Sequence, residues 1–331
     1  GGLEAAIVNT LSPGDKVLAV SIGSFGERFA KIARIFGADV TKLDVEWGQA
    51  ADPGVLRAEL ERSADYKAVL LTHNETSTAV MNPIPELAAV IRELAPDALI
   101  LVDSMSGLGA VPFEMDAWEI DLVVTGSQKA WMAAPGLAMT AASERTWAAM
   151  ANATMPRFYL DLRAHRDAHA GGETPFTPAL AVFFQVDEGI RLMQDEGAEN
   201  VFARHEAAAA ASRAGLKALD FELFADQRHA SRTVTGARVP ADLDWKSFNG
   251  ELRRRGLVLA GGQGKLAGKI FRLGHLGSVT VEEIIGAMST LEMAAIGAGR
   301  MVRPGAAVGA AQAAALESLG IVTPSVAGTA G

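Results

Sequence analysis

Lys129 has the surroundings that most clearly suggest chemistry in this sequence. It follows an apolar run from Leu122 to Thr125 and the small residues Gly126 and Ser127. Such a run predicts a buried parallel strand that delivers the lysine into a tight turn. Burial of an ammonium group is costly unless the group loses its charge or is paired. The position therefore suits a lysine that forms a Schiff base with a carbonyl compound. The alternative is an exposed lysine in a β-turn.

A second apolar run, from Ala98 to Val102, ends at Asp103. Consecutive parallel strands joined by a crossover place their carboxyl ends at the same sheet edge, where α/β proteins bind ligands. We therefore expect Asp103 and Lys129 to face one cleft. A carboxylate for the pyridine nitrogen and a lysine for the aldehyde are the two fixed points that pyridoxal 5'-phosphate (PLP) needs.

Three motifs together resemble those of the class V aminotransferases. They are Thr-His-Asn-Glu-Thr-Ser-Thr at 72–78, Val-Asp-Ser at 102–104 and Thr-Gly-Ser-Gln-Lys at 125–129. The resemblance runs from Gly1 to about residue 295. It is greatest to the alanine/serine–glyoxylate aminotransferases and to proteins named as the small subunit of soluble hydrogenase. It implies an α/β protein of PLP fold type I, with a mostly parallel seven-stranded sheet flanked by helices and a smaller C-terminal α+β domain.

The resemblance also implies a domain organisation. We expect a PLP-binding large domain at 1–195, a small domain at 196–295 and a tail at 296–331. The tail is rich in alanine and glycine and lacks the large side chains that offset ordering entropy, so we expect it to be disordered. The chain does not begin with methionine and opens within a motif. We therefore expect the N-terminal arm and most of the phosphate-binding turn to be missing.

Functional roles follow from the same resemblance. Lys129 would hold PLP and act as general base and acid, and Asp103 would keep the pyridine nitrogen protonated. Arg272, in an apolar strand, would bind the substrate carboxylate, although an internal ion pair is the alternative. The active site would be shared across a homodimer. The remaining residues expected to contact the cofactor are Phe25, Thr76, Met105, Gln128, Gly1 and Gly2, with Thr177 contributed by the neighbouring subunit.

Several other residues could be mistaken for functional groups. Phe25 is expected to stack on the pyridine ring, but it could also be an apolar residue that packs beside a helix start.

His73 and Glu75 could form a metal site or a catalytic pair, and we interpret them as structural support for the site. His165 and His169 have a spacing that can bind metal on a helix, but no third ligand is near in sequence. We therefore predict no metal site.

Composition limits the classes of function. The 331 residues carry 30 Lys and Arg against 39 Asp and Glu, a net charge of −9, which does not favour nucleic acid or anionic membranes as partners. The chain contains no cysteine, so disulfides, thiolate metal sites and the cysteine desulfurases of class V are disfavoured. No apolar run approaches the ~18 residues of a membrane span. We expect a soluble, cytoplasmic enzyme.

The function predicted from these observations is a PLP-dependent transamination. The enzyme would move an amino group from serine or alanine to glyoxylate or a related 2-oxo acid. Two alternatives remain open at this stage. One is a different fold-type-I PLP reaction, such as that of a lyase. The other is a non-catalytic subunit of a larger complex.

Overall fold

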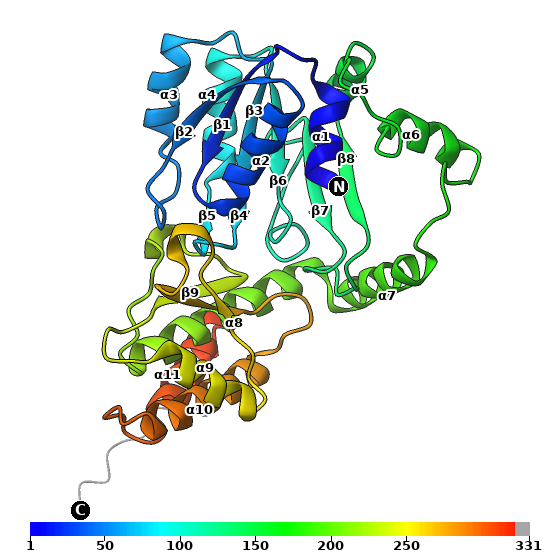
Figure 1. Cartoon of the computed structure of the whole chain (residues 1–331). Coiled ribbons are helices and arrows are strands. Elements are labelled where there is room, and N and C mark those ends of the chain that lie inside the picture. The colour runs from blue at the N-terminus through cyan, green and yellow to red at the C-terminus, as the bar shows by residue number, and fades with distance from the viewer. Residues whose placement is uncertain (322–331) are drawn as a thin grey trace, which may run out of the picture. The chain divides into compact units, whose positions relative to one another are not determined.

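The polypeptide folds into two units, each with its own sheet (Figure 1). The structure, a computed structural model, describes residues 1–321. Among the described residues, the first unit comprises 1–196 together with 225–231, and the second comprises 197–224 together with 232–321. Within the described residues, no helix is long and apolar enough to cross a membrane.

A six-stranded sheet forms the centre of the first unit. Five strands are parallel, and the last pairs antiparallel with its neighbour. In spatial order the strands are β2 (Asp39–Asp44), β1 (Lys16–Ser21), β3 (Ala68–Thr72), β6 (Leu99–Asp103), β7 (Leu122–Gly126) and β8 (Ala138–Ala142). The expected mostly parallel sheet is confirmed, but the expected number of seven strands is wrong. The sheet ends at β2 on one side and at β8 on the other, and no further described segment pairs with either edge.

Both faces of this sheet are covered by helices, as the fully buried strands β3 and β6 require. Alternate residues of β1, β3, β6 and β7 pack against α1 (Gly2–Thr10), α2 (Ser24–Ile35) and α5 (Glu144–Met150). The paired helices α3 (Pro53–Arg62) and α4 (Ile84–Leu94) lie together, away from α1 and α2 (Figure 1). A short hairpin of β4 (Asn74–Glu75) and β5 (Val80–Met81) follows β3.

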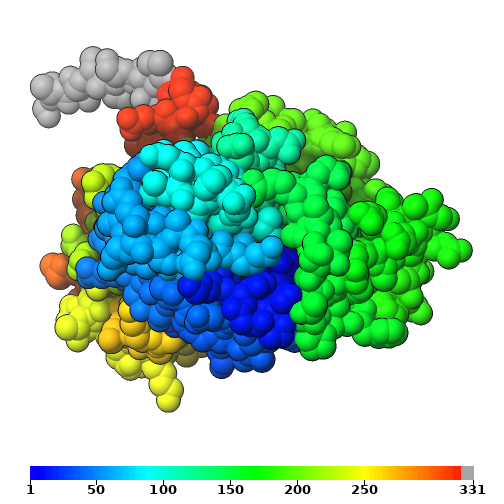
Figure 2. Space-filling view, turned by 90° about the horizontal axis from the view of Figure 1, so that it is seen from above, coloured from blue at the N-terminus to red at the C-terminus, as the bar shows by residue number. Residues whose placement is uncertain are grey.

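The helix α1 packs against the segment that follows α5. The side chain of Asn9 donates a hydrogen bond to the carbonyl of Leu160 at 2.6 Å and accepts one from the amide of Leu162 at 3.0 Å. Figure 2 shows this contact from above, with α1 in dark blue bordered by the green segment. Two further helices, α6 (Leu162–Ala170) and α7 (Leu180–Glu196), complete the first unit.

The second unit has a three-stranded antiparallel sheet in the order β10 (Ala260–Gly261), β11 (Ile270–Gly274) and β9 (Val234–Arg238). Its core includes Phe271, which stacks on Trp245 with 5.1 Å between the ring centroids. In the described part of this unit, the sheet is accompanied by the helices α8 (Ala198–Ala218), α9 (Trp245–Arg254), α10 (Val281–Gly297) and α11 (Ala306–Ser318).

The helix α11 contradicts the expectation that the tail is disordered. Ala307, Ala311 and Ala315 recur every four residues and are fully or almost fully buried, so they form one packed stripe. Their small side chains let α11 approach the alanine-rich helix α8 closely. The buried carboxylate of Glu292 accepts hydrogen bonds from the amides of Gly305 and Ala307, which caps the helix start. The part of this expectation that concerns residues 322–331 lies outside the described residues.

Candidate active site

Asp103 lies at the carboxyl end of β6, between β3 and β7. It is paired with Thr72 on one side and Val124 on the other, and its side chain is buried. Its carboxylate accepts a hydrogen bond from the amide of Met105 at 2.9 Å. Burial raises the pKa of Asp103 to about 7, and the charge of Glu75 adds to the increase, whereas the Met105 amide, Arg28 and Lys129 act in the opposite direction.

Lys129 lies in the turn that follows β7. The turn is held by the Lys129 amide, which donates to the Gly126 carbonyl at 3.3 Å, and by the Met132 amide, which donates to the Lys129 carbonyl at 3.1 Å. Met132 has a φ of 60°, a strained conformation for a non-glycine residue and of a kind often found near active sites. The half-buried Lys129 lowers the pKa of Asp103 electrostatically. Asp103 at the end of β6 and the Lys129 turn after β7 therefore lie at the same edge of the sheet.

Met105 and Gln128 converge over the backbone of Gly126. A Cβ atom at Gly126 would lie 2.5 Å from the Met105 sulfur and 2.9 Å from the Gln128 side-chain oxygen. Only glycine permits this close approach without displacing one of the two side chains. The end of β7 thus places Met105 and Gln128 beside the lysine turn.

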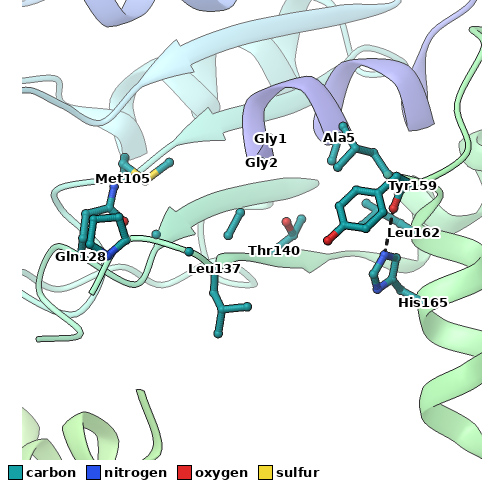
Figure 3. A pocket seen from close by; sticks show the side chains of 15 residues that line it. Gly1, Gly2, Ala5, Met105, Gln128, Leu137, Thr140, Tyr159, Leu162 and His165 are labelled. Atoms are coloured by element: carbon teal, nitrogen blue, oxygen red, sulfur yellow. Dashed lines mark hydrogen bonds between the residues drawn. The ribbon is translucent and has the colours of Figure 1, made fainter. Parts of the chain in front are cut away.

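A cavity of about 520 Å³ opens beside this edge (Figure 3). Met105 and Gln128 lie at one end, and Tyr159 and His165 lie at the other, where the His165 ring contacts the Tyr159 carbonyl at 3.2 Å. The first turn of α1 also lines the cavity, with Gly1 and Gly2. The amides of a first helical turn have no partner within the helix and favour anions, so the part of the cavity beside Gly1 and Gly2 is suited to a phosphate group.

Phe25 and Thr76 come from neighbouring segments of the same unit. Phe25 is half-buried at the start of α2, with the Arg28 guanidinium 4.8 Å from its ring centroid. Thr76 is half-buried in the hairpin that follows β3. The two segments are joined by Glu75, whose carboxylate accepts a hydrogen bond from the Phe25 amide at 2.9 Å.

Comparison with known proteins identifies the family. The family model "Aminotransferase class-V" matches residues 2–273. The chain belongs to the class V aminotransferases. A protein of Synechococcus sp. named soluble hydrogenase, small subunit, is 40% identical, with 94% of this chain and 82% of that protein aligned. A serine–glyoxylate aminotransferase of Methylorubrum extorquens is 33% identical, over 93% of this chain and 79% of that protein.

Solved structures agree with this assignment. The crystal structure of a pyridoxamine–pyruvate aminotransferase from Mesorhizobium loti has a TM-score of 0.90 and 31% identity, and it covers 96% of this chain and 82% of that chain. The predicted PLP fold type I is therefore confirmed, and so is the predicted cofactor, because PLP is the cofactor of class V aminotransferases. The enzyme described here is a PLP-dependent transaminase.

The residues present in this aminotransferase fit PLP. A fully buried carboxyl group with a raised pKa is a site that a cation would stabilise, and the protonated pyridine ring is such a cation. The half-buried Lys129 lies close enough to Asp103 to influence its ionisation. Together with the cavity at the start of α1, these residues supply groups suited to the ring nitrogen, the aldehyde and the phosphate.

Thr177 and Arg272 were also expected in the site. No contact among the described residues of the first unit places either residue at this sheet edge. Thr177 is exposed in the loop between α6 and α7. Arg272 lies on β11 of the second unit, where only 9% of its surface is exposed and its Nε donates to the Gly261 carbonyl at 3.0 Å. Their roles toward the neighbouring subunit and the substrate stay predictions.

The structure also places the residues whose function was ambiguous. The His73 ring lies 2.9 Å from the Ser104 hydroxyl and packs on Phe113 with centroids 5.3 Å apart. Among residues 1–321, no three His, Asp or Glu side chains are arranged to hold a metal ion. Tyr159 and His165 line the cavity but were not predicted to do so.

Proposed function

We propose that this class V aminotransferase transfers the amino group of serine or alanine to glyoxylate or a related 2-oxo acid. The observation that carries the proposal is that the buried Asp103 and the turn with Lys129 lie at the carboxyl ends of the neighbouring strands β6 and β7, beside a cavity of about 520 Å³. The substrate class is supported by the serine–glyoxylate aminotransferase among the relatives. PLP supplies a carbonyl group that takes up the amino group and a protonated ring that withdraws electrons.

Each residue of the site has a task suited to its position. The Asp103 carboxylate accepts a hydrogen bond from the protonated ring nitrogen, and the nearby cation keeps the carboxylate ionised. The Lys129 amine would hold the cofactor through its carbonyl group, and the same amine would take up the proton from the Cα of the substrate amino acid. Gln128, Met105 and Thr76 orient the cofactor, and the Phe25 ring packs on it.

The phosphate and the substrate carboxylate need groups from other parts of the molecule. The amides of Gly1 and Gly2 at the start of α1 bind the phosphate, because helix starts favour anions. We assign Arg272 to the substrate carboxylate, because a guanidinium and a carboxylate can form two parallel hydrogen bonds.

A homodimer with a shared site is also part of the proposal. The region around Thr177 exposes large apolar side chains, among them Phe158 at 81% and Phe184 at 71%. Exposed apolar patches of this kind often mark protein–protein interfaces. In the dimer, Thr177 of one subunit binds the cofactor phosphate of the other. A monomer at micromolar concentration in sedimentation equilibrium would contradict this arrangement.

The test of the substrate is a pair of half-reactions followed by absorbance. Serine or alanine added to the PLP-loaded protein should convert the cofactor to its amine form, and glyoxylate should restore the original spectrum. The Lys129→Ala variant is the control and should show neither change at a comparable rate. A response to other amino acids but not to serine or alanine would contradict the proposed substrates. A protein that binds no PLP would contradict the enzyme itself and favour a non-catalytic subunit.

A further inference from the structure

Glu75 is a buried carboxylate with more hydrogen bonds than any role proposed so far requires. One oxygen accepts from the amides of Phe25 at 2.9 Å and Gly26 at 3.1 Å. The other accepts from the amide of Ser77 at 3.1 Å and from its hydroxyl at 2.6 Å. The side chain is 0% exposed. Four donors therefore converge on one carboxylate that lies between the hairpin and α2.

These bonds cap the start of α2 from outside the helix. The residue before the helix, Gly23, has no side chain to cap it, and the amide of Ser24 donates to the Ser77 hydroxyl at 2.9 Å. The first three amides of α2 are thus bound by Glu75 and Ser77 rather than by the usual local cap. A Cβ atom at Gly23 would lie 2.4 Å from the Glu75 side chain, so the close approach depends on glycine.

The four donors oppose the effect of burial on the charge of Glu75. Burial is the larger influence and raises the pKa of Glu75 overall, whereas the bonds from Ser77, Gly26 and Phe25 act in the opposite direction. An ionised carboxylate can accept all four bonds at once. The partial positive charge of the α2 start further favours the ionised form.

The capped turn carries Phe25 and lies within electrostatic range of Asp103. The charges of Glu75 and of Arg28, one turn into α2, both act on the ionisation of Asp103. The backbone of Phe25 is held at its amide, and its half-buried ring has the Arg28 guanidinium 4.8 Å from its centroid. We propose that Glu75 is a positioning residue of the cofactor site, which holds the first turn of α2 so that the Phe25 ring packs on the cofactor beside Asp103. This inference rests on the proposed function, because it assumes that the cofactor lies at this edge.

The test compares Glu75→Gln with the parent protein in two states. In the cofactor-free protein, hydrogen exchange of the amides at 24–26 should accelerate, because a glutamine side chain accepts hydrogen bonds at only one of its two terminal atoms. In the PLP-loaded protein, the visible circular dichroism of the cofactor should change and the PLP dissociation constant should rise by about tenfold, as expected for a lost hydrogen bond to a charged group.

A matched control separates positioning from general stability. Asp121 is another buried carboxylate with several donors, including the amide of Ile100 at 2.8 Å and Arg92 at 2.6 Å. It lies at the start of β7, the end away from Lys129. Asp121→Asn should lower the melting temperature as Glu75→Gln does, yet leave exchange at 24–26 and the circular dichroism of bound PLP unchanged.

A double-mutant cycle with Phe25→Leu then asks whether Glu75 acts through Phe25. Phe25→Leu should weaken PLP binding, and Glu75→Gln in that background should weaken it little further. Full additivity, or parent-like exchange at 24–26 in Glu75→Gln, would overturn the inference. If Glu75→Gln does not fold, Ser77→Ala removes two bonds of the same cap and gives the same readouts. If the parent binds no PLP, the proposed function fails, whereas the exchange result still reports whether Glu75 holds this turn.

Discussion

Asp103 is the residue on which the electrostatics of the site depend. Its folded-state pKa of about 7 lies above the ordinary value of 3.8, so the folded protein holds this proton more tightly than the unfolded chain. The free energy of unfolding of the cofactor-free protein therefore falls as the pH rises from about 4 to about 7. Above pH 7, the full cost of a buried, ionised Asp103 is present.

Asp103→Asn should therefore have opposite effects on stability and catalysis. At pH 8, the cofactor-free variant should be more stable than the parent by roughly 2–4 kcal/mol, because the asparagine carries no buried charge. At pH 5, most of this gain should be absent. Turnover should fall by on the order of 10²–10⁴, because a neutral amide cannot hold the pyridine proton. Urea unfolding at both pH values and steady-state kinetics check these effects. A loss of stability that is equal at pH 5 and pH 8 would show that Asp103 is only a polar strand end.

Residues of the site differ in how far the sequence alone predicts them. Lys129 and Asp103 could be predicted because each follows a buried apolar run, and adjacent parallel strands end at the same edge. For Glu75 the sequence predicted structural support for the site but not the contacts that provide it, because its partners Phe25 and Gly26 are 50 and 49 residues away in sequence. No local spacing encodes such a contact. The same holds for Tyr159 and His165, which reach the cavity through the packing of α1.

At the scale of elements, the two apolar runs before Asp103 and Lys129 predicted the bounds of their strands within one residue. The expected strand that ends at Asp103 is observed as Leu99–Asp103, and the expected strand from Leu122 to Thr125 is observed as Leu122–Gly126. The antiparallel direction of β8 was not predicted, since an apolar run alone does not specify strand direction.

The helix α11 was missed because alanine and glycine bury little area for each residue. Its stability comes from close packing on α8 and from the Glu292 cap, which are tertiary features. The alanine stripe at 307, 311 and 315 has helical spacing, and this spacing is the signal that composition concealed.

Ala311→Leu tests whether α11 is an integral part of the second unit. Ala311 is 0% exposed, so a leucine must force α11 away from its neighbours and should destabilise the protein by about 1–3 kcal/mol. Ala313→Leu is the matched control, because Ala313 is exposed on the same helix and should change stability little. Chemical denaturation of both variants provides the comparison. Equal stability of the Ala311→Leu variant and the parent would show that α11 does not pack as described.

At the scale of the whole molecule, the proposed site draws on more than one folded unit. Lys129, Asp103 and the cavity belong to the first unit, whereas Arg272 belongs to the second. The proposed contribution of Thr177 comes from another subunit. Sequence patterns describe single elements, and they do not encode how units and subunits assemble. The roles of Arg272 and Thr177 were therefore inferred from family resemblance and remain proposals.

The central claim is that Lys129 holds the cofactor, and chemical trapping tests it most directly. Borohydride reduction of the PLP-loaded protein converts the bond between the cofactor and its lysine into a stable amine, and proteolysis with mass spectrometry then locates it. The account predicts one modified peptide, with the cofactor on the Nζ of Lys129. Modification of a different lysine, or the release of all PLP from the reduced and unfolded protein, would contradict the account.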